Sequence, residues 1–193
     1  RGQVQRAQQG RPPKGTRPLG YATDGSIIAA EAAAVRELFR FLAIEDGPSI
    51  AALAAGLSGK VAPHVPASLS HLPKHTRTLM IERNKRRAAI GEDPAPVPPD
   101  GPWHSSTVLG ILRNPRHAGY SVYTDRNARA QIKRRTWYAQ IARDEHGNPV
   151  TGPWTPSVDE LTWLAVQERL DDQRRVTNRS GSTARKHLGS RLY

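Results

Sequence analysis

Hydrophobic positions along the chain recur mainly with the three-and-four spacing of helices. The clearest case, residues 29–44, predicts a helix with one apolar face formed by Val35, Leu38, Phe39 and Leu42. Gly47-Pro48 ends this pattern, and Ser49 is placed to cap a second, shorter helix over 50–57. Its inward positions are Ile50, Leu53 and Leu57. Both helices are expected to belong to the core.

A third helix is expected over 157–175, where Ser157 and Glu160 have the spacing of a capping box. Acidic residues at its start and Arg174-Arg175 at its end complement the helix dipole. The expected packing residues are Leu161, Trp163, Leu164 and Leu170.

The stretch from Trp103 to Tyr123 predicts a helix followed by β structure. Ser105 or Ser106 can cap a helix whose apolar face is Val108, Ile111 and Leu112. Asn114-Pro115 stops it, because proline disfavours helical conformation in the preceding residue. Gly119 then opens a β-rich run, 120–124. The helix has an ordinary packing interpretation, but its free N-terminal N–H groups and hydroxyls also suit phosphates and base edges.

Turn signals predict two hairpins and one long irregular excursion. Asp24-Gly25 predicts a tight turn, and a basic ribbon would pair 120–124 with 136–142. Residues 60–102 are rich in proline, with one amphipathic helix possible over 76–91. The predicted fold class is therefore mainly α with small antiparallel β hairpins (α+β), a helical domain with long irregular connections.

Charge is the strongest bulk signal. Lys and Arg number 29 against 17 Asp and Glu, a formal net charge of +12, and arginine dominates the cations. Arginine favours forked contacts with phosphate, so nucleic acid is the expected partner. No apolar run approaches the length of a membrane span, no signal peptide is recognisable, and there is no cysteine. A cytoplasmic location is expected.

No catalytic constellation stands out from the sequence. A nucleophile elbow, a P-loop, a zinc-protease helix and a dinucleotide fingerprint are all absent. His71 and His75 are four apart, but Pro73 between them disfavours the helix that a metal site would need. We therefore expect no metal, no cofactor and no enzyme activity in this chain.

Several short motifs occur together in one order. They are GTRPLGY at 15–21, EAAAVRELFRFLAIEDGPSIAALAAGL at 31–57, Trp103-x4-Val108-x2-Ile111-Leu112-x-Asn114-Pro115-x3-Gly119, and VDELTWLAVQERL at 158–170. Together they resemble the DNA-binding domain of the large serine recombinases, the phage-type serine integrases. His117 stands where that family usually has tyrosine, and Ser58 where asparagine often follows leucine.

The resemblance implies a division of the chain and a set of DNA contacts. Residues 1–17 would be a basic linker or arm, 18–176 the DNA-binding domain with 60–102 as an irregular insertion, and 177–193 a tail. The arm would follow the minor groove, the 103–116 element would approach the major groove, and further cations would contact phosphates. The implied residues are Arg11, Lys14 and Arg17 in the arm, His104, Ser105, Ser106 and Thr107 at base edges, and Arg113, Arg116, Lys133, Arg134 and Arg135 on phosphates.

The same resemblance implies that this is a middle segment of a longer recombinase. A preceding domain would cut and rejoin DNA through a phosphoserine linkage, and a following zinc-ribbon domain would hold zinc. The expected partners are double-stranded DNA at attachment-site half-sites, other integrase subunits and a recombination directionality factor. The expected location is the nucleoid of a bacterial host. A transposon-type serine recombinase, a general basic RNA-binding module and an independent nuclease are the alternatives.

Overall fold

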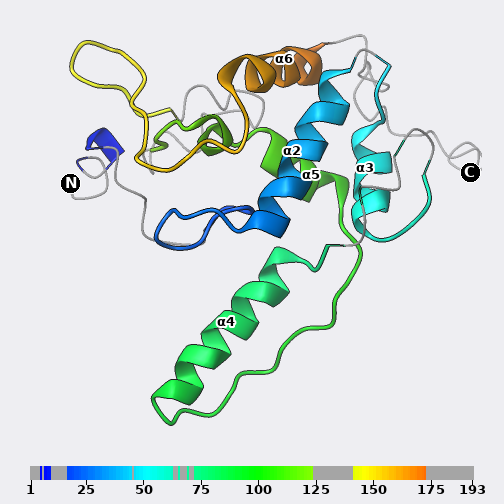
Figure 1. Ribbon diagram of the computed structural model, residues 1–193, viewed down its shortest axis with the longest axis vertical. Helices are drawn as coiled ribbons and strands as arrows, with labels where there is room; N and C mark the ends of the chain where they lie inside the picture. The colour runs from blue at the N-terminus through cyan, green and yellow to red at the C-terminus, as the bar shows by residue number, and fades with distance from the viewer. Residues whose placement is uncertain are drawn as a thin grey trace, which may run out of the picture.

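The computed structural model describes residues 5, 7–9, 17–44, 46–62, 65, 69, 72–123 and 141–172. Within these ranges the chain is mainly helical, with five α-helices and one short 3-10 helix (Figure 1). Labels follow Figure 1. The elements are α2 (Ala29–Ala43), α3 (Ile50–Leu57), α4 (His75–Ala89), α5 (Ser105–Leu112), η1 (Pro115–Ala118) and α6 (Glu160–Asp171).

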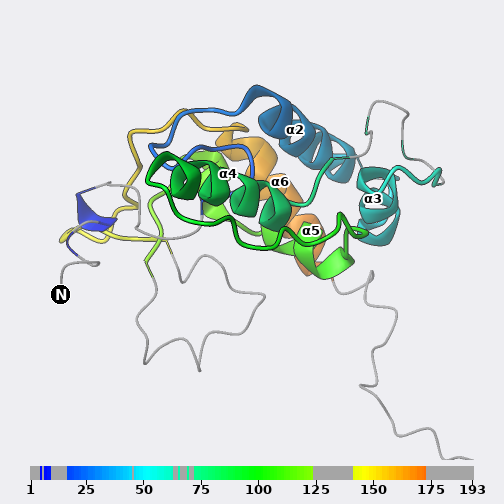
Figure 2. The ribbon, with the colours of Figure 1, turned by 90° about the horizontal axis from the view of Figure 1, so that it is seen from below.

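The core lies between α2, α3, α5 and α6. The four residues predicted for the apolar face of α2 are fully buried, which confirms that helix. The Ser49 side chain accepts a hydrogen bond from the Ala52 N–H at 3.1 Å, as expected of the cap of α3. Figure 2 shows α2 along one edge of the helical body and α5 along the opposite edge. Trp163 of α6 and Trp103 before α5 complete the core.

β structure is reduced to isolated bridges in the part of the chain that the structure describes. The Asp24-Gly25 turn is present, with Gly25 at φ 92° and a single antiparallel bridge between Tyr21 and Ile27. No strand forms there because α2 begins two residues after Ile27. Of the expected ribbon, the described residues show the bridge between Val122 and Ile141, whereas 124–140, which include the tip and most of the second arm, lie outside the described residues.

The excursion at 60–102 contains α4, a helix of 15 residues that begins one residue before the expected span of 76–91 and ends two residues before the end of that span. Figure 1 shows α4 extending away from the body, with the following segment returning alongside it. The returning segment is fixed by paired hydrogen bonds between the Asn84 side chain and the Ala95 backbone, at 2.8 and 2.9 Å. The Arg87 Nε also donates to the Asp93 carbonyl at 2.7 Å.

The closing helix α6 differs from its prediction at its start and on its surface. Asp159, not Ser157, is the N-cap, and its carboxylate accepts from the Thr162 N–H at 2.8 Å. The capping box is therefore wrong. Ser157 is instead buried, where its hydroxyl donates to the Tyr21 phenol oxygen at 2.8 Å. Trp163 is buried as expected, whereas Leu161 and Leu164 are exposed.

The N-terminal residues that the structure describes contact the base of the expected ribbon. Ala7 is buried, and its carbonyl accepts a hydrogen bond from the Ser121 hydroxyl at 2.9 Å. This contact joins segments that are 114 positions apart. As for the helices of the described ranges, none combines the length and the apolar character that a membrane crossing requires.

Candidate DNA interface

The first turn of α5 presents four consecutive polar side chains to solvent. The helix begins at Ser105, so His104 is the N-cap, and no side chain caps this end. The expectation that a serine caps α5 is therefore wrong, and both serines lie inside the first turn. An uncapped N-terminus leaves N–H groups and the positive end of the helix dipole facing outward. The exposed residues are His104, Ser105, Ser106 and Thr107.

The opposite face of α5 is fixed to the core, which determines how the polar turn is presented. Val108 and Leu112 are fully buried. Just before the helix, the Trp103 indole N–H donates to the Leu72 carbonyl at 2.6 Å, and its backbone N–H donates to the Ser58 hydroxyl at 2.9 Å. Ser58 thus holds the backbone at the start of α5 in place. A rigid inner face allows the outer turn to hold one orientation.

Gly110 was not among the predicted site residues, but it lies one helical turn beyond Ser106. A methyl group added at Gly110 would meet no atom within 4 Å, so packing within the described chain does not require glycine here. A glycine inside a helix costs roughly 0.5–1 kcal/mol relative to alanine. Its sequence signal was an isolated glycine in an otherwise helical pattern. Such a position is suited to the close approach of another molecule.

Arg113 follows α5 but faces the interior. Its Nη2 lies 2.5 Å from Asp171 Oδ1 of α6, and its Nη1 donates to Gln167 Oε1 at 3.2 Å. The Gln167 amide in turn donates to the Leu112 carbonyl at 2.8 Å, satisfying the C-terminus of α5. Arg113 therefore joins α5 to α6, and its guanidinium is not presented to solvent as the sequence prediction assumed.

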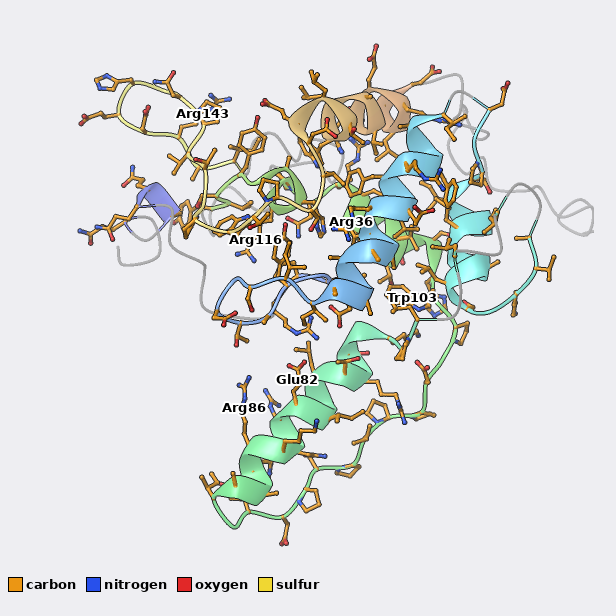
Figure 3. The ribbon with its side chains drawn as sticks, in the orientation of Figure 1. Arg36, Glu82, Arg86, Trp103, Arg116 and Arg143 are labelled. Carbon is orange, nitrogen blue, oxygen red and sulfur yellow. The ribbon has the colours of Figure 1, made fainter. Side chains whose placement is uncertain are left out.

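Arg116 is the half-buried cation of η1. Its guanidinium lies 5.9 Å from the centroid of the Trp154 ring, and burial lowers the pKa of Arg116 while the phenol of Tyr21 partly counteracts the shift. No carboxylate pairs with it among the residues that the structure places. Figure 3 shows Arg116 beside the 141–156 segment, apart from α4. A cation desolvated in this way is suited to an incoming phosphate.

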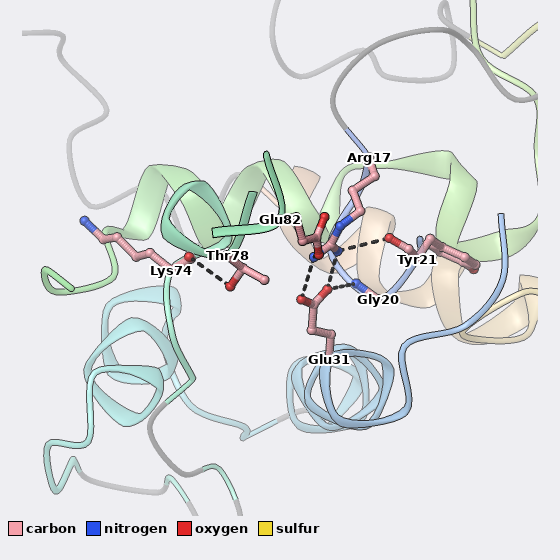
Figure 4. Close-up of polar contacts among 7 residues, drawn as sticks. All are labelled: Arg17, Gly20, Tyr21, Glu31, Lys74, Thr78 and Glu82. Atoms are coloured by element: carbon pink, nitrogen blue, oxygen red, sulfur yellow. Dashed lines mark hydrogen bonds and ion pairs between the residues drawn. The ribbon is translucent and has the colours of Figure 1, made fainter. Parts of the chain in front are cut away.

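Arg17 is buried in a cluster that joins the entry of the domain to two helices (Figure 4). Its two terminal nitrogens contact the Glu31 carboxylate at 2.7 and 3.0 Å, and Nη2 also contacts Glu82 at 3.0 Å. Burial opposes its charge, but the hydrogen bonds and charges of Glu31 and Glu82 outweigh burial and raise the pKa of Arg17. Arg17 thus has partners within the chain and does not face solvent as a minor-groove arm residue would.

The remaining predicted cations, which are Arg11, Lys14, Lys133, Arg134 and Arg135, lie outside the described residues. The structure therefore neither groups them with α5 nor separates them from it. Of the predicted set, the exposed turn of α5 and the Arg116 side chain are placed where a ligand can reach them.

Comparison with known families decides what this surface belongs to. Residues 29–173 match the family model described as Recombinase, three quarters of the chain. The chain belongs to the Recombinase family. This is the DNA-binding domain of the large serine recombinases, and the resemblance found in the sequence is confirmed. A comparison with curated proteins gives no match.

Membership gives the Recombinase domain its partner and its process. DNA is the ligand, and the binding serves site-specific recombination. The matched span begins at the first residue of α2 and extends just past α6. It includes α5, Arg113 and Arg116, whereas the buried cluster around Arg17 reaches it only through Glu31 and Glu82.

Proposed function

We propose that this domain recognises one half of an attachment site in duplex DNA, with the first turn of α5 reading base edges in the major groove. The observation that supports this most is the outward, uncapped turn of α5 beside the open position at Gly110. Short hydroxyl side chains allow the helix backbone to approach base edges closely, and serine and threonine can donate to or accept from a base.

Phosphate contacts would fix the register of α5 on the duplex. Arg116, which has no carboxylate partner in the described ranges, is the cation that we assign to this role. Arg11 and Lys14 would follow the minor groove, and Lys133, Arg134 and Arg135 would contact the backbone. Arg17 and Arg113 are left out of the proposed contacts because carboxylates already pair with their guanidinium groups.

In the parent recombinase, we propose that strand cutting and rejoining belong to a separate serine-nucleophile domain. The present domain would then select the site and position the other subunits, and a directionality factor would act on the assembled complex. A zinc ribbon would hold any zinc. This division predicts that the purified chain does not nick supercoiled plasmid in the presence of divalent metal ions.

The test is a selection from a pool of randomised duplexes, followed by fluorescence anisotropy on the selected sequence and on a scrambled one. Specific recognition predicts affinity for the selected duplex at least roughly a thousandfold above that for the scrambled duplex. Ser106→Ala and Thr107→Ala should reduce this ratio, while Arg116→Gln should weaken binding to both duplexes. Equal affinity for selected DNA, scrambled DNA and structured RNA would leave only a general basic module.

A further inference from the structure

Helix α4 lies in the excursion and has one face that no part of the core covers. The helix spans 15 residues, so it is about 22 Å long. A groove of about 590 Å³ separates it from the turn after Arg17. Figure 3 shows Arg86 on the side of α4 that faces this turn. The residues of the groove wall that the argument uses are Thr23, Thr76, Leu79, Met80, Arg83 and Arg86.

The cations of this groove are available, whereas its acid is already paired. Arg83 and Arg86 are exposed, and no carboxylate pairs with either within the described ranges. Glu82, which also lines the groove, lies 3.0 Å from the buried Arg17 guanidinium. On the returning segment, Glu92 lies 3.4 Å from Arg87, which is outside the groove lining. The groove therefore presents two guanidinium groups that no carboxylate of the described chain segments pairs with.

The chemistry of the lining fits one strand of a sugar–phosphate backbone. Guanidinium forks match phosphate geometry, and the hydroxyls of Thr23 and Thr76 can donate to phosphate oxygens. Leu79 and Met80 supply an apolar surface of the kind that a deoxyribose ring can cover. The chain as a whole is strongly positive, which disfavours a second copy of itself as the occupant.

We propose that the groove between α4 and the turn at 18–28 binds the backbone of duplex DNA outside the base pairs that α5 reads. This inference rests on the proposed function, because it adds a second contact to the same duplex. Helix α4 thereby lengthens the footprint on DNA without reading sequence. Its link to the core through Glu82 and Arg17 holds the two contacts in a fixed relation.

The experiment uses the double variant Arg83→Gln/Arg86→Gln on the selected duplex. Anisotropy titrations at several salt concentrations should show several-fold weaker binding and a slope of log K against log salt reduced by about 1.8, since each lost phosphate contact contributes about 0.9. Ethylation interference should show that the variant loses adjacent phosphates on one strand. The variant Arg83→Lys/Arg86→Lys should retain most of the slope.

The single variants Arg86→Gln and Lys85→Gln form a matched pair, because each removes one exposed charge from α4. Lys85→Gln is the control. Lys85 does not line the groove, and it lies about 200° around the helix from Arg83. The control should therefore keep the wild-type interference pattern. If Lys85→Gln weakens binding as much as Arg86→Gln, diffuse charge accounts for the effect and the groove assignment is overturned.

Two further outcomes separate this inference from the proposed function. If the wild-type chain and the Arg83→Gln/Arg86→Gln variant bind the selected duplex identically, the DNA contact at the groove is overturned but the proposed function is not. Wild-type chain that selects no duplex overturns both. Sedimentation velocity tests whether a second copy of the chain occupies the groove instead. If the variant changes the oligomeric state but keeps every phosphate contact, the groove binds protein and the proposal is overturned.

Discussion

The guanidinium of Arg17 and the carboxylate of Glu31 form a buried ion pair with two contacts, at 2.7 and 3.0 Å. The Gly20 N–H donates to the same carboxylate at 2.9 Å, so Glu31 fixes the turn that precedes its own helix. Through Glu82 the pair also reaches α4. One carboxylate in α2 thus positions the entry segment, and Arg17 in turn holds α4 through Glu82.

Removing Glu31 should strongly destabilise the fold. Glu31→Ala removes the carboxylate that makes two contacts with the buried Arg17 guanidinium. Breaking a buried ion pair in this way costs about 3–5 kcal/mol. The measurement is the free energy of unfolding in urea. Glu37→Ala on the same helix is the control, because Glu37 pairs with the exposed Arg40 and such pairs contribute about 1 kcal/mol or less. Similar losses in the two variants would contradict a structural role specific to Glu31.

His117 should make stability depend on pH. Its ring is fully buried, stacked on Tyr21 at 5.9 Å and edge-on to Phe39 at 5.8 Å. Neither ring nitrogen has a hydrogen-bond partner among the residues that the structure describes. Burial, with a smaller effect of the Arg116 charge, lowers the pKa of His117 to about 3. The folded imidazole therefore stays neutral where the unfolded one, with a pKa near 6.5, takes up a proton.

Because the unfolded chain binds the extra proton between these two values, this histidine should lower stability as the pH falls from about 6.5 toward about 3. The loss should reach up to about 1.4 kcal/mol per pH unit, and above pH 6.5 it should vanish. Urea unfolding of wild type and His117→Phe across this range isolates the effect from other groups. Parallel pH profiles for the two proteins would show that the buried imidazole does not cause it.

The start of α6 should depend on Asp159. Asp159→Ala removes the side-chain acceptor for the Thr162 N–H, and loss of such a cap costs about 0.5–2 kcal/mol. The hydrogen bonds from the Thr162 hydroxyl and N–H lower the pKa of Asp159, so the cap weakens only when acid protonates it. Thermal unfolding of Asp159→Ala and Asp159→Asn checks this, since asparagine also caps. Equal losses in both variants would point to charge instead of capping.

The local sequence pattern was sufficient to predict α2 and α3, because apolar spacing, and for α3 a nearby cap, act within one segment. It failed where burial depends on distant partners. Gln167 is buried because its amide bonds the Leu112 carbonyl, 55 positions away, while Leu161 faces solvent although it is apolar. Apolar spacing alone gave no reason to bury a glutamine in place of a leucine.

The candidate interface shows the same limit. Sequence revealed the positive charge of Arg17 and Arg113 but not the carboxylates, 14 and 58 positions away, that pair with them. Conversely, the polar first turn of α5 was anticipated from the N–H groups and hydroxyls at the start of the helix and from the family resemblance. Which arginines of α4 lack a carboxylate partner within the described ranges is seen only in the structure, where Glu92 of the returning segment lies beside Arg87 and not beside Arg83 or Arg86.

Gly110 offers a way to separate DNA binding from stability. Space above it is open, so Gly110→Ala and Gly110→Gln should both stabilise the fold by roughly 0.5–1 kcal/mol, because alanine and glutamine favour helices over glycine. If α5 approaches the base edges closely, the glutamine side chain occupies the space that DNA needs. Gly110→Gln should then lose most of its affinity for the selected duplex, while Gly110→Ala retains more. Ala33→Gln, at an exposed position of α2, is the control and should bind as wild type does. A stabilised Gly110→Gln variant with undiminished affinity would mean that DNA does not approach this face of α5.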